Sequence, residues 1–501
     1  MKEYGIFELQ EKMSSGEMTA HEIASSYLER IETIDRNGAR LNSVIELNPE
    51  ALAIASALDA ERASGALRSP LHGVPILLKD NIDTADEMQT TAGSLALEGH
   101  RAACDAGLVE KLRAAGAVIL GKTNLSEWAN FRGKNSVSGW SSRGGLTRNA
   151  YALDRSACGS SSGSGAAVAA NLAAAAVGTE TDGSIICPAQ TNGIVGIKPT
   201  LGLVSRSGII PISHSQDTAG AMARTVADAA ILLGAMSGFD GRDPVTKSGV
   251  KRGLADYKSS LNANGLKGAR IGVARSLFGS DQRIIRIMES SLDAMKQAGV
   301  VLVDVELKPS ERFRKTEVEV MLFEFKAGLN AYLAGLKPDA RVHSLADVMR
   351  FNEENRARVM PYFGQERMEQ AQAKGSLRSG KYLAALERNH RLARTEGVNA
   401  VMNKHRLDAI TCPSGGAAWT VDLVNGDGIC NWDMDNTSYA AVAGTPHITV
   451  PAGYVFGLPV GISFFAKAWQ EARLIKLAYA FEQLTKVRKP PRFLPTADVG
   501  V

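Results

Sequence analysis

The chain has 501 residues, and its 57 Lys and Arg against 53 Asp and Glu give a formal net charge of only +4. This length fits about three ordinary domains or one large α/β unit. No block of five like charges occurs, so nothing in the charge pattern indicates binding to nucleic acid or a membrane surface. With 45% apolar and 22% charged residues, the bulk of the chain is not disordered.

The first 120 residues predict alternating helices and strands. A capping box at Thr19–Glu22 begins a helix that runs to about Asp35. We then expect a strand at 41–47, a helix at 49–63, a strand at 74–78, a helix at 107–115 and a strand at 117–120. Such alternation indicates an α/β fold with helices packed on a parallel or mixed sheet.

Residues 159–220 are rich in Gly, Ser and Thr and are the expected place for function, with a buried alanine-rich helix at Ala166–Val177. Residues 241–405 are more charged, and we expect them to form a helical, variable flank or cap within a single domain of residues 1–501. Helices are expected at 284–298, 313–333 and 383–405, and strands at 270–274 and 300–305. The last hundred residues return to the first pattern, with strands at 409–412, 447–450 and 460–464 and helices at 436–443 and 470–484. One sheet built from both chain ends is therefore predicted.

The cysteines and the first residues bear on the cellular location. Five scattered cysteines are too few for a disulfide framework, which favours a reducing compartment. Charged residues stand near the start where a secretory signal would need an apolar stretch. The sequence as written therefore predicts a cytoplasmic protein, or a periplasmic or secreted one if a leader was removed. The longest uncharged stretch, 157–179, holds a Ser/Gly cluster and an Asn, so we expect no membrane span.

Two motif matches conflict with their context. Gly116–Thr123 fits the phosphate-loop pattern, but its Ala-Val-Ile-Leu centre is typical of a buried strand, whose N–H groups do not converge on a phosphate. Gly159–Gly163 fits the nucleophile-elbow pattern with Ser161 at its centre, but no apolar strand leads into it. We reject both. The eight histidines are isolated, so no metal site is expected; His214 is either functional or a loop residue.

Three segments carry residues suited to acyl transfer. Lys79 ends the apolar run Val74–Leu78, and burial would lower its pKa and make it a base; pairing with Asp80 is the alternative. The other two segments, GSSSGSG at 159–165 and GTETDGSIICP at 178–188, place hydroxyl groups in a permissive backbone. Consecutive N–H groups in the second segment could form an oxyanion hole.

Together these segments resemble the amidase signature family. The resemblance is carried by a lysine block PLHGVPILLKDNIDT, a Gly/Ser block CGSSSGSGAAVAA and a nucleophile block GTETDGSIICPAQTNGIVGIKPTLGLVSRSGIIP. Ser160 and Ser184 have the family's spacing of 24 residues. KTNLSEWANFRG, SQDTAG and GLPVGISFFA extend the likeness to nearly the whole chain, except parts of about 240–405. Within the family, TETDGSI, LSEWANFRG and FEFKAGL are most similar to bacterial peptide amidases.

The resemblance implies the amidase signature fold, a large twisted mixed sheet with helices on both faces. It implies Ser184 as the nucleophile that forms an acyl-enzyme, Ser160 as a proton shuttle after a cis peptide bond, and Lys79 as the final base. No cofactor or metal is implied. The substrate-binding residues would be Thr181, Asp182 and Gly183, whose N–H groups would hold the oxyanion with that of Ser184.

Two departures bear on the substrate. Asp182 precedes Gly183, and Ile186 stands where many members have an arginine, so nothing there would pair with a substrate carboxylate. We predict a hydrolase that converts a neutral carboxamide, a peptide C-terminal amide, to a carboxylate and ammonia. The alternatives are a broad aryl or alkyl amidase and the amidase subunit of a tRNA-dependent amidotransferase; the intact Lys79, Ser160 and Ser184 disfavour a non-catalytic binding module. The expected partner is a small-molecule or peptide amide, with no nucleic acid or membrane, and the chain is expected to be a monomer or homodimer.

Overall fold

The computed structural model describes residues 2–250, 252, 256–308, 310–429 and 436–500. It is built around a sheet of 11 strands in the order β1-β3-β2-β6-β8-β7-β12-β13-β11-β9-β10, with a separate two-stranded sheet of β4 and β5. The strands are β1 (Val44–Leu47), β2 (Pro75–Lys79), β3 (Val118–Thr123), β4 (Trp140–Ser141), β5 (Gly145–Leu146), β6 (Ala175–Glu180), β7 (Val195–Lys198), β8 (Thr218–Ala223), β9 (Arg270–Val273), β10 (Val301–Asp304), β11 (Ala409–Pro413), β12 (His447–Val455) and β13 (Leu458–Phe465).

The sheet mixes parallel and antiparallel pairs. β2 is parallel to both β3 and β6, whereas β8 is antiparallel to β6 and β7. β12 and β13, from the C-terminal part of the chain, form an antiparallel pair that joins β7 on one side and β11 on the other. The prediction of one mixed sheet built from both ends of the chain is confirmed.

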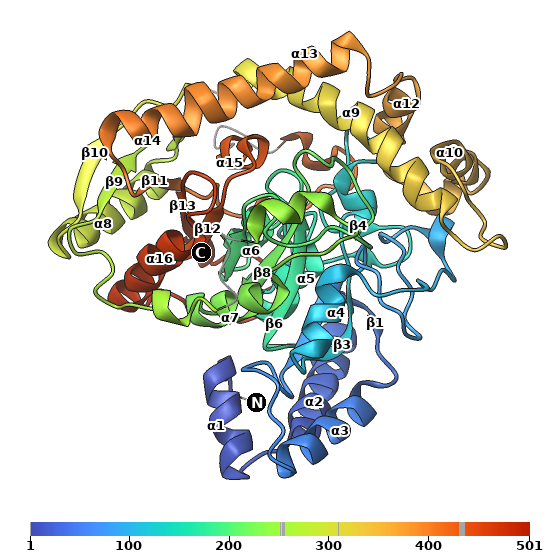
Figure 1. The fold of residues 1–501 in the computed structure, drawn as a ribbon, viewed down its shortest axis with the longest axis horizontal. Helices are drawn as coiled ribbons and strands as arrows, with labels where there is room; N and C mark the ends of the chain where they lie inside the picture. The colour runs from blue at the N-terminus through green and yellow to red at the C-terminus, as the bar shows by residue number, and fades with distance from the viewer. Residues whose placement is uncertain (1, 251, 253–255, 309, 430–435, 501) are drawn as a thin grey trace.

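Helices cover both faces of the sheet (Figure 1). Every residue of β2, β3, β6 and β8 is buried, as expected for strands in the middle of a covered sheet. None of the helices in the described ranges is long and apolar enough to cross a bilayer. The α-helices are α1 (Ile6–Ser15), α2 (Ala20–Arg30), α3 (Ala51–Ala63), α4 (Gly107–Ala114), α5 (Ser162–Ala169), α6 (Ile186–Thr191), α7 (Val226–Met236), α8 (Gln282–Gln297), α9 (Glu311–Ala334), α10 (Leu345–Glu354), α11 (Arg356–Val359), α12 (Glu366–Gln372), α13 (Gly380–Asn389), α14 (Asn399–His405), α15 (Ser438–Ala443) and α16 (Glu471–Thr485).

Local sequence signals explain where several elements begin. The predicted capping box is present at α2, where the Thr19 side chain accepts a hydrogen bond from Glu22 N and the Glu22 carboxylate accepts one from Thr19 N. α2 continues as a π-helical turn to Arg36, close to the predicted end at Asp35.

The segment 241–405 divides into two parts. β9 and β10 pair in parallel, and β9 joins β11, so residues 270–305 extend the main sheet. The helices that follow form the cap, and α9 and α13 lie side by side along the top of the molecule (Figure 1). Phe323 of α9 and Tyr382 of α13 pack with ring centroids 5.7 Å apart. This contact joins α9 to α13 within the cap.

The expected helix at Ala166–Val177 is wrong in its second half. α5 ends at Ala169, and the chain enters β6 at Ala175. Asn171 adopts φ 56°, and Leu172 N donates to Ala167 O at 2.9 Å, which closes the helix with a left-handed residue. A run of small apolar residues has no periodicity that separates a buried helix from a buried strand, so the pattern could not show this boundary.

Candidate active site

Lys79 lies at the carboxyl end of β2, an interior strand that is the third from one side of the sheet. Both neighbours of this strand, β3 and β6, run parallel to it, so the ends of the three strands meet at one edge. Glu180 ends β6 at the same edge. In open α/β sheets this edge is where ligands bind.

The Lys79 amine is fully buried and surrounded by oxygen atoms. Its Nζ lies 2.8 Å from Ser160 Oγ, 2.9 Å from Thr179 Oγ1 and 3.2 Å from Thr179 O. Asn81 Nδ2 donates to the same threonine hydroxyl at 3.0 Å, so this hydroxyl is fixed between two side chains. The amine is thereby directed at the Ser160 hydroxyl.

Burial lowers the pKa of Lys79 to about 7, because a charged ammonium loses its hydration inside the protein. The nearby carboxylates of Glu180 and Asp217 act in the opposite direction and raise it. A substantial fraction of the side chain is therefore the neutral amine near pH 7, and in that form it can accept a proton.

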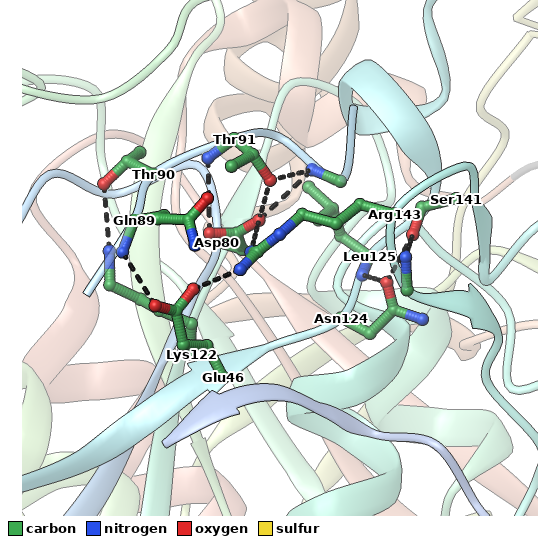
Figure 2. Close-up of polar contacts among 12 residues, drawn as sticks. Glu46, Asp80, Gln89, Thr90, Thr91, Lys122, Asn124, Leu125, Ser141 and Arg143 are labelled. Carbon is green, nitrogen blue, oxygen red and sulfur yellow. Dashed lines mark hydrogen bonds and ion pairs between the residues drawn. The ribbon is translucent and has the colours of Figure 1, made fainter. Parts of the chain in front are cut away.

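The next residue, Asp80, does not pair with the lysine that precedes it. Its carboxylate accepts hydrogen bonds from the Thr91 hydroxyl and from Gly93 N (3.2 Å), and it lies 3.5 Å from the Arg143 guanidinium. Figure 2 shows that Arg143 also reaches Glu46, so these residues join β1, β2 and the loop after β2 in one network, in which Asp80 is buried and Arg143 and Glu46 are partly exposed. The alternative prediction, that Lys79 pairs with Asp80, is therefore wrong. The network around Asp80 instead holds the backbone of Lys79 in place.

The fold agrees with the prediction that Gly116–Thr123 is a strand and not a phosphate-binding loop. Residues 118–123 form β3, and Lys122 is buried. Its Nζ donates to Ile82 O at 2.6 Å. It also donates to the Thr90 hydroxyl at 3.0 Å (Figure 2). Lys122 therefore has a structural role behind the sheet edge.

Ser160 and Ser161 lie in the turn that leads into α5. The Gly159–Ser160 peptide bond is cis, as the resemblance implied, and Ser160 O accepts a hydrogen bond from Ser126 N at 3.1 Å. Ser161 Oγ instead donates to Thr179 O (3.0 Å) and accepts from Thr179 N (3.2 Å). Ser161 therefore braces the backbone, and the nucleophile-elbow reading of this turn is not supported.

Ser184 follows β6 by four residues and is nearly buried, with 9% of its surface exposed. Its carbonyl accepts a hydrogen bond from Ser161 N at 3.2 Å, which joins the two serine-bearing segments. Among the described residues, its hydroxyl and the N–H groups of Gly183 and Ser184 have no hydrogen-bond partner. Gly183 supplies the left-handed conformation of this turn, with φ 75°. Two adjacent N–H groups therefore remain available for an external acceptor.

Glu180 holds the segment that carries Ser184. It is buried, and its Oε2 accepts from Ile185 N at 2.7 Å and from Ile186 N at 3.0 Å. These two N–H groups lie at the start of α6, where a carboxylate is favoured by the unpaired N–H groups of the helix end. Glu180 therefore holds the turn, and its carboxylate raises the pKa of Lys79 against the larger lowering effect of burial.

Asp182 and Thr181 direct their side chains to other parts of the protein. The Asp182 carboxylate accepts from Thr437 Oγ1 (2.7 Å) and Ser438 Oγ (2.6 Å) at the start of α15. Thr181 Oγ1 donates to Asp217 at 2.6 Å. These two side chains brace the turn, so the predicted role of Thr181 and Asp182 in substrate binding concerns their backbone.

Asp217 anchors the loop that faces the turn. Its second carboxylate oxygen accepts from Ile212 N (2.9 Å) and Ser213 N (2.8 Å), and burial raises its pKa to about 6. Gln216 Nε2 donates both to Thr181 O (3.2 Å) and to Glu317 of α9 (3.0 Å). The helical cap is therefore tied directly to the turn that carries Ser184.

A cavity of about 430 Å³ opens beside Thr179 and Thr181. Its walls include the apolar segment Ile209–Ile212 and Tyr332 of α9. His214 also lines it, with a side chain that is 54% exposed and whose Nε2 lies 3.4 Å from Glu324 Oε1. His214 thus lies outside the Lys79–Ser160 group, as a loop histidine would. No group of three His, Cys, Asp or Glu side chains in the described part of the chain is placed to hold a metal.

Sequence reasoning missed several residues that shape this site. Thr179 and Glu180 lie inside the nucleophile block, and Asp217 lies inside SQDTAG, but their letters do not reveal which side chains they contact. The disulfide between Cys158 and Cys187 was also not predicted, because 29 positions separate the two cysteines and no spacing rule connects them. Tertiary contacts alone define these roles.

Comparisons with known proteins identify the family of this chain. The family model described as Amidase matches residues 22–475. A probable amidase of Arabidopsis thaliana is 39% identical over 99% of this chain and 92% of its own length. One of the subunits of the glutamyl-tRNA(Gln) amidotransferase of Pseudomonas syringae is 34% identical over 97% of this chain and 98% of its own length.

The similar solved structures include peptide amidases. The native peptide amidase from Stenotrophomonas maltophilia is 49% identical, with a TM-score of 0.92 over 98% of this chain and 99% of that one. A peptide amidase in complex with the competitive inhibitor chymostatin is 50% identical, with a TM-score of 0.94 over the same shares. Because the family model and these relatives span nearly the full chain, the protein belongs to the amidase family and has the amidase signature fold.

Proposed function

We propose that this amidase hydrolyses the C-terminal carboxamide of a peptide to a carboxylate and ammonia through an acyl-enzyme on Ser184. The observation that carries the catalytic assignment is the buried Lys79 amine, 2.8 Å from the Ser160 hydroxyl. An amine in that position, with its pKa lowered to about 7, is a base connected to a hydroxyl relay.

In the first half-reaction Ser184 Oγ attacks the amide carbon. Its proton passes to Ser160 Oγ while the Ser160 proton passes to Lys79 Nζ, so Ser160 keeps its proton count and the amine becomes an ammonium. The N–H groups of Gly183 and Ser184 donate to the oxyanion, and each such donor typically contributes about 2.7 to 4 kcal/mol to the transition state. The proton then returns along the relay to the leaving NH₂ group, which departs as ammonia.

In the second half-reaction a water molecule replaces ammonia. It gives one proton to the relay as its oxygen attacks the acyl-enzyme, and the proton returns to Ser184 Oγ when the ester bond breaks. The free carboxylic acid then leaves and ionises. Lys79 therefore ends each cycle as the neutral amine with which it began.

Three observations support an uncharged peptide amide as the substrate. Ile186 is buried where many members of the family have an arginine, so this position offers no partner for a substrate carboxylate. Peptide amidases are the similar structures at 49–50% identity. The cavity beside Thr181, with its apolar Ile209–Ile212 wall, is large enough for the side chain of a peptide residue.

The substrate assignment predicts a ranking of ammonia release. Purified enzyme should hydrolyse amidated dipeptides with a kcat/KM at least about 10-fold above that for benzamide and for free glutamine, since the two latter compounds lack a peptide chain to bind in the cavity. An enzyme-coupled ammonia assay at fixed substrate concentrations measures all three. Equal or faster release from benzamide would establish a broad amidase instead. Faster release from glutamine, or activity only with partner proteins, would identify the amidotransferase alternative suggested by the 34% identical relative.

A second prediction concerns the charge of Glu180. Because this carboxylate raises the pKa of Lys79, Glu180→Gln should shift the acid limb of the kcat/KM profile to lower pH. The uncharged amide oxygen of Gln accepts weaker hydrogen bonds from Ile185 N and Ile186 N, and a small displacement of the Ser184 turn should also lower kcat by about 10- to 100-fold.

The matched control is Glu471→Gln. Glu471 is also buried and accepts a backbone hydrogen bond, from Thr200 N at 2.7 Å, but it does not act on Lys79. The kcat/KM profile of Glu471→Gln should have its acid limb at the same pH as that of the wild-type enzyme. An unshifted limb in Glu180→Gln would show that this carboxylate does not act on the catalytic base.

A further inference from the structure

We propose that the Cys158–Cys187 disulfide is a positioning pair that sets the distance between the Ser160 and Ser184 hydroxyls. This inference rests on the proposed roles of the two serines. Cys158 lies two residues before Ser160, and Cys187 lies three residues after Ser184. The covalent ring closed by the disulfide therefore contains both serines together with Thr179 and the Gly183 turn.

The disulfide joins two segments that have little regular structure of their own. Cys158 is in the left-handed region with φ 54°, in a turn that precedes α5, and α6 has only six residues. Cys187 N donates to Gly183 O at 2.8 Å, so Cys187 is bonded directly to the turn of the nucleophile. A change in the position of Cys187 is therefore transmitted to Ser184.

Hydrogen bonds and the packing of α5 on α6 also link the two segments. Ser161 N donates to Ser184 O at 3.2 Å. Thr191 Oγ1 and Asn192 Nδ2 both donate to Ala157 O, at 3.1 and 3.0 Å. Each bond of this kind contributes only about 0.5–1.5 kcal/mol net, so it holds the segments less firmly than a covalent bond does.

The turn that carries Ser160 is closely packed against Ser126. A Cβ at Gly159 would lie 2.2 Å from Ser126 Oγ, and Ser162 Oγ donates to Cys158 O. The turn therefore packs closely against the body of the protein, and the disulfide fixes the nucleophile segment to that packed turn. Proton transfer between the two hydroxyls depends on this separation, and a displacement of about 1 Å can cost about 100-fold in rate.

We therefore expect a loss in kcat and not in substrate affinity when the pair is removed. Cys158→Ala, Cys187→Ala and the double variant should each lower kcat by about 10- to 100-fold and change KM by less than about 3-fold. The three variants should have the same kcat, because either single substitution already breaks the bond. The acid limb of the pH profile should stay in place, since Lys79 keeps its surroundings.

The measurement uses any amide that the wild-type enzyme hydrolyses, at a temperature where circular dichroism shows every variant folded. Active sites are counted with a fluorophosphonate label, so that kcat refers to intact sites. Cys104→Ser is the control, since Cys104 is exposed and free, and it should retain wild-type kcat. Unreduced, denatured wild-type protein should show no more than three reactive thiols among its five cysteines.

Several results would overturn the proposal. Five reactive thiols would show that the disulfide does not form, and wild-type kcat in the folded double variant would show that it does not position the serines. If the variants do not fold, reduction of the folded wild-type enzyme replaces them: a reversible loss of kcat, restored by reoxidation, supports the proposal, and an unchanged kcat refutes it. Ser184→Ala is assayed alongside to distinguish failure of the disulfide proposal from failure of the proposed function. If Ser184 is not the nucleophile, Ser184→Ala remains active; if only the disulfide proposal is wrong, Ser184→Ala is inactive.

The pair also bears on where the enzyme works. Disulfides persist in oxidising compartments and are reduced in the cytosol. Full activity is therefore expected in a periplasmic or secreted setting, the second of the two locations considered from the sequence.

Discussion

Ser184→Ala should lower kcat on an amide substrate by about 10⁴- to 10⁶-fold while leaving the fold intact, because removal of a nucleophile eliminates the covalent route altogether. The side chain makes no hydrogen bond to other described residues, so its loss should change the free energy of unfolding by less than about 1 kcal/mol. Steady-state ammonia release and chemical denaturation measure the two quantities.

The control for this variant is Ser248→Ala, an exposed serine whose Oγ donates to Val245 O and which does not line the cavity beside the site. It should retain wild-type kcat. A Ser184→Ala enzyme within about 10-fold of wild type would remove Ser184 as the nucleophile. A covalent acyl adduct trapped on any other residue would have the same consequence.

Lys79→Met should reduce kcat by several orders of magnitude, because it removes the base at the end of the relay and leaves a side chain of similar length. In the wild-type enzyme kcat/KM should rise with pH through about 7, as the amine becomes neutral. The variant should lose this acid limb along with the activity. Lys296→Met, at an exposed position of α8, is the control and should keep both.

Lys79→Met should lower kcat but should not lower the free energy of unfolding at pH 7. The pKa of Lys79 is about 7 in the folded protein and about 10.4 in an unfolded chain, so between these values the unfolded state binds more protons. The wild-type free energy of unfolding should therefore gain from this group as pH rises from about 7 to 10, and Lys79→Met should lack that gain. At pH 7 the methionine variant should be at least as stable as wild type, since it buries no ammonium. A variant that is inactive and strongly destabilised would indicate a structural role for the lysine.

The elements that periodicity and capping define were predictable, and those defined by a single residue conformation were not. The Thr19 capping box began α2 as expected, and the apolar run before Lys79 formed a central strand. The alanine run after Ser162 looked the same in helix and strand, and only the left-handed conformation of Asn171 separates α5 from β6. Hydrophobic pattern carries no information about such a residue.

In the site, too, some residues were predictable from local motifs and others were not. Lys79, Ser160 and Ser184 were predicted from motifs as the catalytic residues, and the structure places the first two in contact. The Asp182 side chain could not be assigned, because its partners Thr437 and Ser438 lie 255 and 256 positions away. Contacts at that separation follow from the order of the strands, which no local pattern determines.

The order of the strands in the sheet also determines how much of the chain must be synthesised before the site can form. β7, which follows the Ser184 segment, has β12 as one neighbour, and the Asp182 turn is bonded to α15, so both depend on residues 437–455. At about 5–20 residues per second the ribosome needs tens of seconds to travel from Ser184 to that region. A nascent chain therefore carries Ser184 long before the residues that support its turn are made, and we expect unfinished copies to hydrolyse no amide.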